Sequence, residues 1–171
     1  RVLSKAPASA GDTPPPRLER GEAYYPLDAR LTTADMPTHV RRIITSSDIT
    51  EIVKARLANF KRYQRSAQRL RPMQSFALQL PDATCPWVYP VLLEDRALWD
   101  YRLRDAGVAL HTFGIYLHSS LFSRGDPRAI EDARFLAERM LCLSIHQDLS
   151  EADIDRNCVI IENMLSHAHQ P

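Results

Sequence analysis

Apolar residues recur every three or four positions between residues 48 and 70, the spacing of one face of an α-helix. The positions on this face are Ile49, Ile52, Val53, Leu57, Phe60, Tyr63, Ala67 and Leu70. Asp48 and Glu51 have the spacing of a capping box at the start of a helix, and Pro72 ends it. The pattern therefore predicts one long amphipathic helix over about 48–70.

The opposite face of this helix is basic. It carries Lys54, Lys61, Arg62, Arg65, Arg69 and Arg71. Such a run of cations usually forms a solvated face or a face packed on the acidic groups of a partner. Phosphate binding is the alternative interpretation.

Downstream of residue 86, short apolar runs alternate with helical patterns. The predicted order is strand 87–93, helix 95–106, strand 108–112, loop 113–125, helix from 126, strand 141–145 and helix 151–166. Asp126 and Pro127 open one helix as N-cap and first residue, and Ser150 with Asp153 has capping-box spacing for the last. Pro90 cannot donate to a ladder, which favours an edge strand or a bulge. The order predicts an α/β or α+β fold, with a small β-sheet of about three strands covered by helices.

The first 46 residues follow neither pattern. Residues 1–21 are rich in proline and small residues and have little to bury, which predicts a flexible tail. Residues 22–46 carry scattered apolar groups without a clean period, which predicts an arm docked on something larger, with a short helix near 37–45. We therefore divide the chain into a Pro-rich tail and arm over 1–46 and a domain over 47–171.

The composition is that of an ordinary globular chain. Of its 171 residues, 22 are Lys or Arg and 21 are Asp or Glu, so the net charge of +1 gives no overall attraction to nucleic acid or to an anionic membrane. No stretch approaches the roughly 20 apolar residues of a membrane span, and the cytoplasm is the expected location. Cys85, Cys142 and Cys158 are expected to be reduced, buried thiols. Trp87 and Trp99 are expected to be core aromatics.

Four short segments share an order and spacing with a known family. They are 56–60 (RLANF), 85–91 (CPWVYPV), 103–108 (LRDAGV) and 133–150 (ARFLAERMLCLSIHQDLS). Together, over residues 46–166, they resemble the C-terminal part of DegT/DnrJ-type aminotransferases, the pyridoxal-phosphate (PLP) enzymes that aminate nucleotide-linked keto sugars. The chain departs from the family at Ser144, where the family usually has proline, and the family's lysine motif is absent from it.

The resemblance implies a domain like the C-terminal domain of fold-type I PLP transferases, with residues 22–46 linking it to a second domain. It implies PLP as the cofactor of the complete enzyme and none bound to this chain alone, because transamination needs a lysine that forms a Schiff base. The lysines are Lys5, Lys54 and Lys61, and none has a setting suited to that role. The implied partner is a PLP-bearing large domain or partner subunit, in a homo-oligomer, packed on exposed apolar surface along 22–60.

Residues suited to contact a sugar nucleotide lie in and near the predicted loop. They are His111, Tyr116, His118, Arg124 and, at the end of a later strand, His146. Their side chains donate hydrogen bonds or carry positive charge, which suits a diphosphate. The alternative for Tyr116 and His118 is that they cover the sheet edge, and for His146 that it bonds to backbone. We predict no catalytic residue and no metal site in this chain.

Two hypotheses about function remain at this stage. The leading one is an aminotransferase C-terminal domain that is inactive without its cofactor domain. The alternative is a stand-alone, non-catalytic module that keeps the small-domain fold and binds a protein or a nucleotide sugar. The basic helix and the Pro-rich tail are then its interaction surfaces. A nucleic-acid binder is disfavoured because aromatic residues are not interleaved with the cations of the helix.

Overall fold

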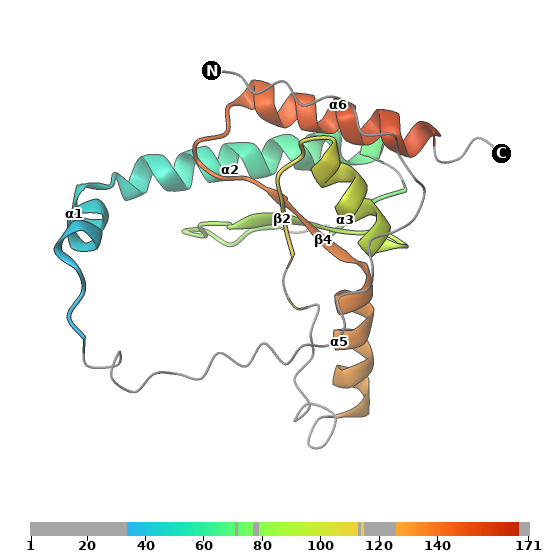
Figure 1. Cartoon of the computed structure of the whole chain (residues 1–171), viewed down its shortest axis with the longest axis horizontal. Helices are drawn as coiled ribbons and strands as arrows, with labels where there is room; N and C mark the ends of the chain where they lie inside the picture. The colour runs from blue at the N-terminus through green and yellow to red at the C-terminus, as the bar shows by residue number, and fades with distance from the viewer. Residues whose placement is uncertain (1–33, 71, 77–78, 113, 115–125, 168–171) are drawn as a thin grey trace.

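The computed structural model describes residues 34–70, 72–76, 79–112, 114 and 126–167 (Figure 1). Its elements are α1 (Thr38–Ser46), α2 (Ile49–Ser66), the 3₁₀ turn η2 (Ala67–Leu70), β1 (Gln74–Ser75), β2 (Val88–Leu92), α3 (Arg96–Asp105), β3 (Leu110–His111), α5 (Pro127–Arg139), β4 (Met140–Ser144) and α6 (Glu151–His167). The predicted tail lies outside the described residues. The predicted α/β class is confirmed.

The helices begin where their capping residues predicted. The Asp48 carboxylate accepts from the Glu51 amide at 3.1 Å at the start of α2, and the Asp126 carboxylate caps α5 ahead of Pro127. At α6 the Asp153 amide donates to the Ser150 hydroxyl at 3.2 Å, while the Asp153 carboxylate accepts from the Ser150 amide at 2.9 Å. The Ser150 hydroxyl, which also donates to this carboxylate, lowers the pKa of Asp153. Each cap satisfies amides that have no partner inside the helix.

The four strands form one antiparallel sheet in the order β1-β2-β4-β3. The sheet therefore has one strand more than the three predicted. β1 was missed because Gln74 and Ser75 are two exposed polar residues without any alternation, and only their pairing with Leu92 and Val91 makes them a strand.

Pro90 lies in an interior strand whose register with β4 is uninterrupted, so the prediction of an edge strand or a bulge was wrong. β2 pairs with β4 on one side along its whole length, with Pro90 opposite Cys142. On its other side, β1 reaches only Leu92 and Val91. In the described part of the chain β2 is thus unpaired on that side at Pro90, where a missing amide donor costs no ladder bond.

The core lies between one face of the sheet and the helices. Figure 1 shows α2 and α6 side by side above the strands, and the two helices contact each other. Tyr89 of β2 packs edge-on against Phe60 of α2 at 5.0 Å between ring centroids and stacks on Tyr63 at 5.5 Å. Leu141 and Leu143 of β4 have no exposed surface. These buried apolar surfaces supply most of the favourable free energy of folding.

Polar contacts fix α2 against α6. The Arg62 guanidinium forms ion pairs with Asp155, to which its Nε donates at 2.7 Å, and with Glu151. The hydrogen bond from Arg62 lowers the pKa of Asp155. Deeper in, the Asn157 amide donates to the Tyr63 hydroxyl at 3.1 Å. Burial raises the pKa of Tyr63, so this hydroxyl stays protonated.

Candidate functional site

His111 and Trp87 form an aromatic pair at the end of β3. Their ring centroids lie 5.6 Å apart with planes at 41°. Trp87 is 58% exposed, so the prediction that it is a core aromatic was wrong, whereas Trp99 is buried as predicted. Trp87 precedes β2 and contacts His111 at the sheet margin instead of the core. The pair presents an exposed aromatic face beside a partly buried imidazole.

His146 lies elsewhere, two residues beyond the end of β4. Its ring Nδ1 accepts from the Asp148 amide at 3.3 Å, and the Asp148 carboxylate lies 3.5 Å from the same nitrogen. In the β3–β4 register His111 is opposite Cys142, four residues before His146, so the structure does not bring the two histidines together. The remaining predicted site residues, Tyr116, His118 and Arg124, lie outside the described residues.

Asn59 lies in segment 56–60, which carries part of the family resemblance, but it was not among the predicted site residues. It is only 3% exposed, and its amide nitrogen donates to the carbonyls of His146 and Leu149, each at 3.1 Å. One turn earlier on α2, Arg56 Nε donates to the Gln147 side chain at 2.9 Å. The segment 56–60 therefore holds the loop between β4 and α6. The spacing of Arg56 and Asn59 on one helix face was the available signal.

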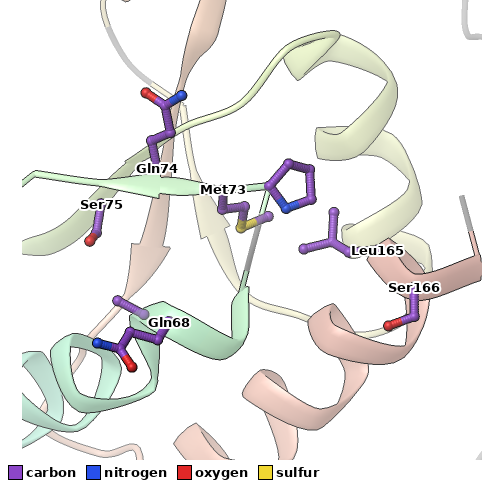
Figure 2. Close-up of a pocket in the computed structure, with 8 residues that line it drawn as sticks. Gln68, Met73, Gln74, Ser75, Leu165 and Ser166 are labelled. Atoms are coloured by element: carbon purple, nitrogen blue, oxygen red, sulfur yellow. The ribbon is translucent and has the colours of Figure 1, made fainter. Parts of the chain in front are cut away.

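A pocket opens between η2, β1 and the end of α6 (Figure 2). The residues drawn and labelled there are Gln68, Met73, Gln74, Ser75, Leu165 and Ser166. The Tyr89 hydroxyl is buried nearby without a hydrogen bond of good geometry, although Ser75 is close enough to oppose the rise in the pKa of Tyr89 that burial causes. None of the residues that line this pocket titrates, so its amides and hydroxyls suit a neutral ligand and no acid–base chemistry.

The exposed side of α2 forms an open groove, which we call the outer groove. It is lined by Ile49, Thr50, Val53, Lys54, Leu57, Ala58, Lys61, Arg65 and Ala83. Apolar side chains alternate along it with cations at helical spacing. Ile49, Val53 and Leu57 belong to the predicted apolar face, and the core leaves them at least partly uncovered. The groove also contains Lys54, Lys61 and Arg65, so the predicted apolar and basic faces of the helix meet here.

Apolar exposure continues from the outer groove onto α1. None of the residues of α1 is buried. The exposed fractions are 63% for Ile43, 54% for Ile44, 62% for Ile49 and 47% for Met36. These four residues, which we call the N-terminal apolar patch, are half of the large apolar side chains that stand exposed in the described chain. Isolated exposed apolar residues are normal, but a run of them usually marks an interface.

Other kinds of site find little support in the described residues. They contain no group of three His, Cys, Asp or Glu side chains arranged to hold a metal ion. None of their helices combines the length and apolarity needed to cross a bilayer. Cys142 and Cys158 are buried as predicted, whereas Cys85 is exposed, contrary to the prediction that all three thiols are buried.

No protein-family model and no curated protein matches the chain. Solved structures do. An aminotransferase from Streptoalloteichus hindustanus matches with a TM-score of 0.58 and 25% identity over 71% of this chain and 34% of that one. A DegT/DnrJ/EryC1/StrS aminotransferase from Brucella abortus matches with a TM-score of 0.55 and 22% identity, over 66% of this chain and 31% of that one. A sugar aminotransferase from Micromonospora echinospora matches with a TM-score of 0.54 and 21% identity, over 67% of this chain and 31% of that one.

These matches show that the chain has the fold of one part of DegT/DnrJ-type aminotransferases, as its sequence motifs predicted. The chain spans about a third of the length of the aminotransferases it matches.

Proposed function

We propose that this chain, with its aminotransferase fold, is the C-terminal domain of an aminotransferase-family protein that acts on nucleotide-linked keto sugars. It works only when joined to a PLP-bearing domain, on the same or another chain, within a cytoplasmic homo-oligomer. The observation that carries the proposal is the combination of this fold with a match to only a third of each related enzyme. A fold alone does not establish an activity, and we assign the chemistry to the two thirds of such an enzyme that this chain does not match.

The described residues do not fit PLP. A lysine that anchors this cofactor needs a desolvated setting and a cradle for the phosphate. Lys54 stands in the outer groove with 73% of its side chain exposed and pairs with Glu51 at 3.4 Å, and Lys61 lies exposed one turn from Arg65. Neither has an aromatic ring beside it in the groove. We therefore assign the cofactor to the other domain.

The N-terminal apolar patch supports a second domain. Ile43, Ile44 and Ile49 lie on α1 and at the start of α2, within the range of residues predicted to face the missing domain. Complete burial of one such side chain is worth about 1.5–3 kcal/mol. Covering the patch therefore contributes a favourable free energy of several times this amount, from which the cost of association must be subtracted.

In the complete enzyme the chain's part is to bind and orient substrate. We assign His111 and His146, with Tyr116, His118 and Arg124, to contacts with the sugar nucleotide. Imidazole N–H groups donate to phosphate or sugar oxygens. Asn59 fixes the backbone at His146, so that histidine is held on a rigid support.

A graft tests the proposal. This chain replaces the matched third of the Streptoalloteichus hindustanus aminotransferase, and the product is assayed for lysine-bound PLP absorbance and for amino transfer to nucleotide-linked keto sugars. We expect retained cofactor and measurable transfer. A matched graft that carries Ile43→Glu and Ile44→Glu should lose both, because carboxylates would enter the apolar patch.

The opposite outcome has a clear meaning. A graft that folds but transfers no amine, together with 1:1 binding of a nucleotide sugar by the isolated chain, would refute the proposal. It would favour the stand-alone binding module instead.

A further inference from the structure

Apart from Arg56, which donates to Gln147, the cations of α2 and η2 separate into two groups by what faces them. On the side of α6, Arg62 is neutralised by Asp155 and Glu151, and Arg69 lies 3.9 Å from Glu162. Each of these pairs joins two helices and belongs to the fold. The second group, Lys54, Lys61 and Arg65, lines the outer groove.

The groove cations have no comparable partners. Among the residues that the structure describes, Lys54 pairs only with Glu51, one turn away on its own helix. The Arg65 Nε donates to the backbone carbonyl of Lys61 at 3.3 Å, and its charge acts on Asp155 as the weakest of the causes that lower that pKa. In the described part of the chain, Lys61 forms no ion pair. The groove therefore carries positive charge that the fold does not neutralise.

The groove floor is apolar. Ile49 is 62% exposed, and Val53 and Leu57 are partly exposed at the next two turns. This i, i+4, i+8 spacing matches the apolar edge of an amphipathic helix laid alongside. No aromatic residue lines the groove, so it offers no platform on which nucleic-acid bases stack.

The charge also disfavours the same face of a second copy. Two outer grooves packed together would place Lys54, Lys61 and Arg65 against their own counterparts, and like charges brought together cost free energy. An apolar helix edged with carboxylates complements both the floor and the rim.

We propose that the outer groove docks an acidic amphipathic helix of a protein partner. The identification of that partner with the cofactor domain rests on the proposed function. The proposal that the groove docks an acidic helix does not rest on it, because it depends only on three cations around a floor of Ile, Val and Leu.

The test uses the full 171-residue chain and labelled synthetic peptides. Each peptide repeats leucine at helical spacing, with glutamate, glutamine or lysine at the flanking positions. Fluorescence anisotropy measures their affinities at low and high salt. We expect the glutamate peptide to bind about tenfold more tightly than the glutamine peptide at low salt, because three exposed ion pairs at about 0.5 kcal/mol each amount to one decade. High salt should remove the tighter binding of the glutamate peptide, because it screens exposed ion pairs.

Charge reversal locates the site. Lys54→Glu with Lys61→Glu should abolish the preference for the glutamate peptide and create one for the lysine peptide. The matched control, Arg128→Glu with Arg134→Glu on α5, changes the net charge equally at exposed positions and should keep the original preference. Circular dichroism confirms that both variants are folded.

Three outcomes would overturn the proposal. The first is equal affinity for all three peptides. The second is that the control variant loses the preference for the glutamate peptide as fully as the groove variant does. The third is that the chain binds phosphatidylserine vesicles and not the acidic peptide. The peptide assay contains neither PLP nor substrate, so its failure is separate from failure of the graft. A graft that folds but transfers no amine, together with successful peptide binding, would count against the aminotransferase role and leave the proposed docking of an acidic helix intact.

Discussion

Replacement of Asn59 by alanine tests how the fold holds the loop that carries His146. The Asn59 amide is the donor to two carbonyls, those of His146 and Leu149, at 3.1 Å each. Alanine keeps the helix, because its helix propensity exceeds that of asparagine. The substitution therefore isolates the two hydrogen bonds.

The expected loss is about 2–3 kcal/mol. Each hydrogen bond contributes a net of roughly 0.5–1.5 kcal/mol. The His146 carbonyl keeps the Leu149 amide as a donor at 3.0 Å, whereas the Leu149 carbonyl loses its Asn59 donor in a partly buried place, which adds to the cost. Asn59 itself is 3% exposed, so water has little access to replace its amide. Against a total stability of about 5–15 kcal/mol for a domain, such a loss is easily measured.

Urea unfolding followed by circular dichroism measures the loss. Two controls separate the bonds from their surroundings. His146→Ala removes an exposed ring but leaves the carbonyl that Asn59 binds, and Asn163→Ala removes an exposed amide on α6, so each should cost below about 1 kcal/mol. If Asn59→Ala costs no more than these controls, the loop is held by other contacts and the reasoning is wrong.

Four further predictions concern thiols, pH, cofactor and dynamics. Cys85 should react at once with a thiol reagent, whereas Cys142 and Cys158 should react only after unfolding. Burial raises the pKa of Cys142 from 9.0 to about 11. The folded chain then keeps a proton that the unfolded chain loses, so stability should fall between about pH 9 and 11, by up to roughly 1.4 kcal/mol per pH unit in urea titrations. Borohydride reduction with PLP should give no stoichiometric adduct at Lys54 or Lys61, and a single fully modified lysine would contradict the assignment of the cofactor to another domain. Amides of α1 should exchange rapidly with deuterium in the isolated chain and slowly in the graft.

The helices were predictable because their signals are local. Asp48 with Glu51 and Ser150 with Asp153 each act within one turn, so spacing alone predicted the helix starts. Strand β1 carried no such signal. Gln74 and Ser75 form a strand only because they pair with Leu92 and Val91, and these chain segments meet only in the folded protein.

The division of the basic helix face could not be predicted from its spacing. Lys61 and Arg62 are sequence neighbours and both are cationic. Arg62 pairs with Asp155, which is 93 positions away, whereas Lys61 faces the outer groove. Likewise, the role of Asn59 depends on a carbonyl 87 positions away. The sequence indicated which residues carry useful chemistry, but only the packing of α2 on α6 decides which of them are satisfied.

The position of the buried residues along α2 is the strongest physical argument that this chain has a partner. All four buried residues of the helix, Asn59, Phe60, Tyr63 and Ser66, lie in its second half. The first half of α2 has one long-range hydrogen bond, from Arg56 to Gln147, but no buried residue, and the nine-residue α1 has no buried residue either. A helix as short as α1 is marginal in water without tertiary packing. Both nevertheless carry exposed apolar surface. Rapid exchange in α1 that slows when a second domain is present would show that this surface is incomplete by itself. Protection in the isolated chain would mean that α1 needs no partner, and the apolar patch would then lose its significance.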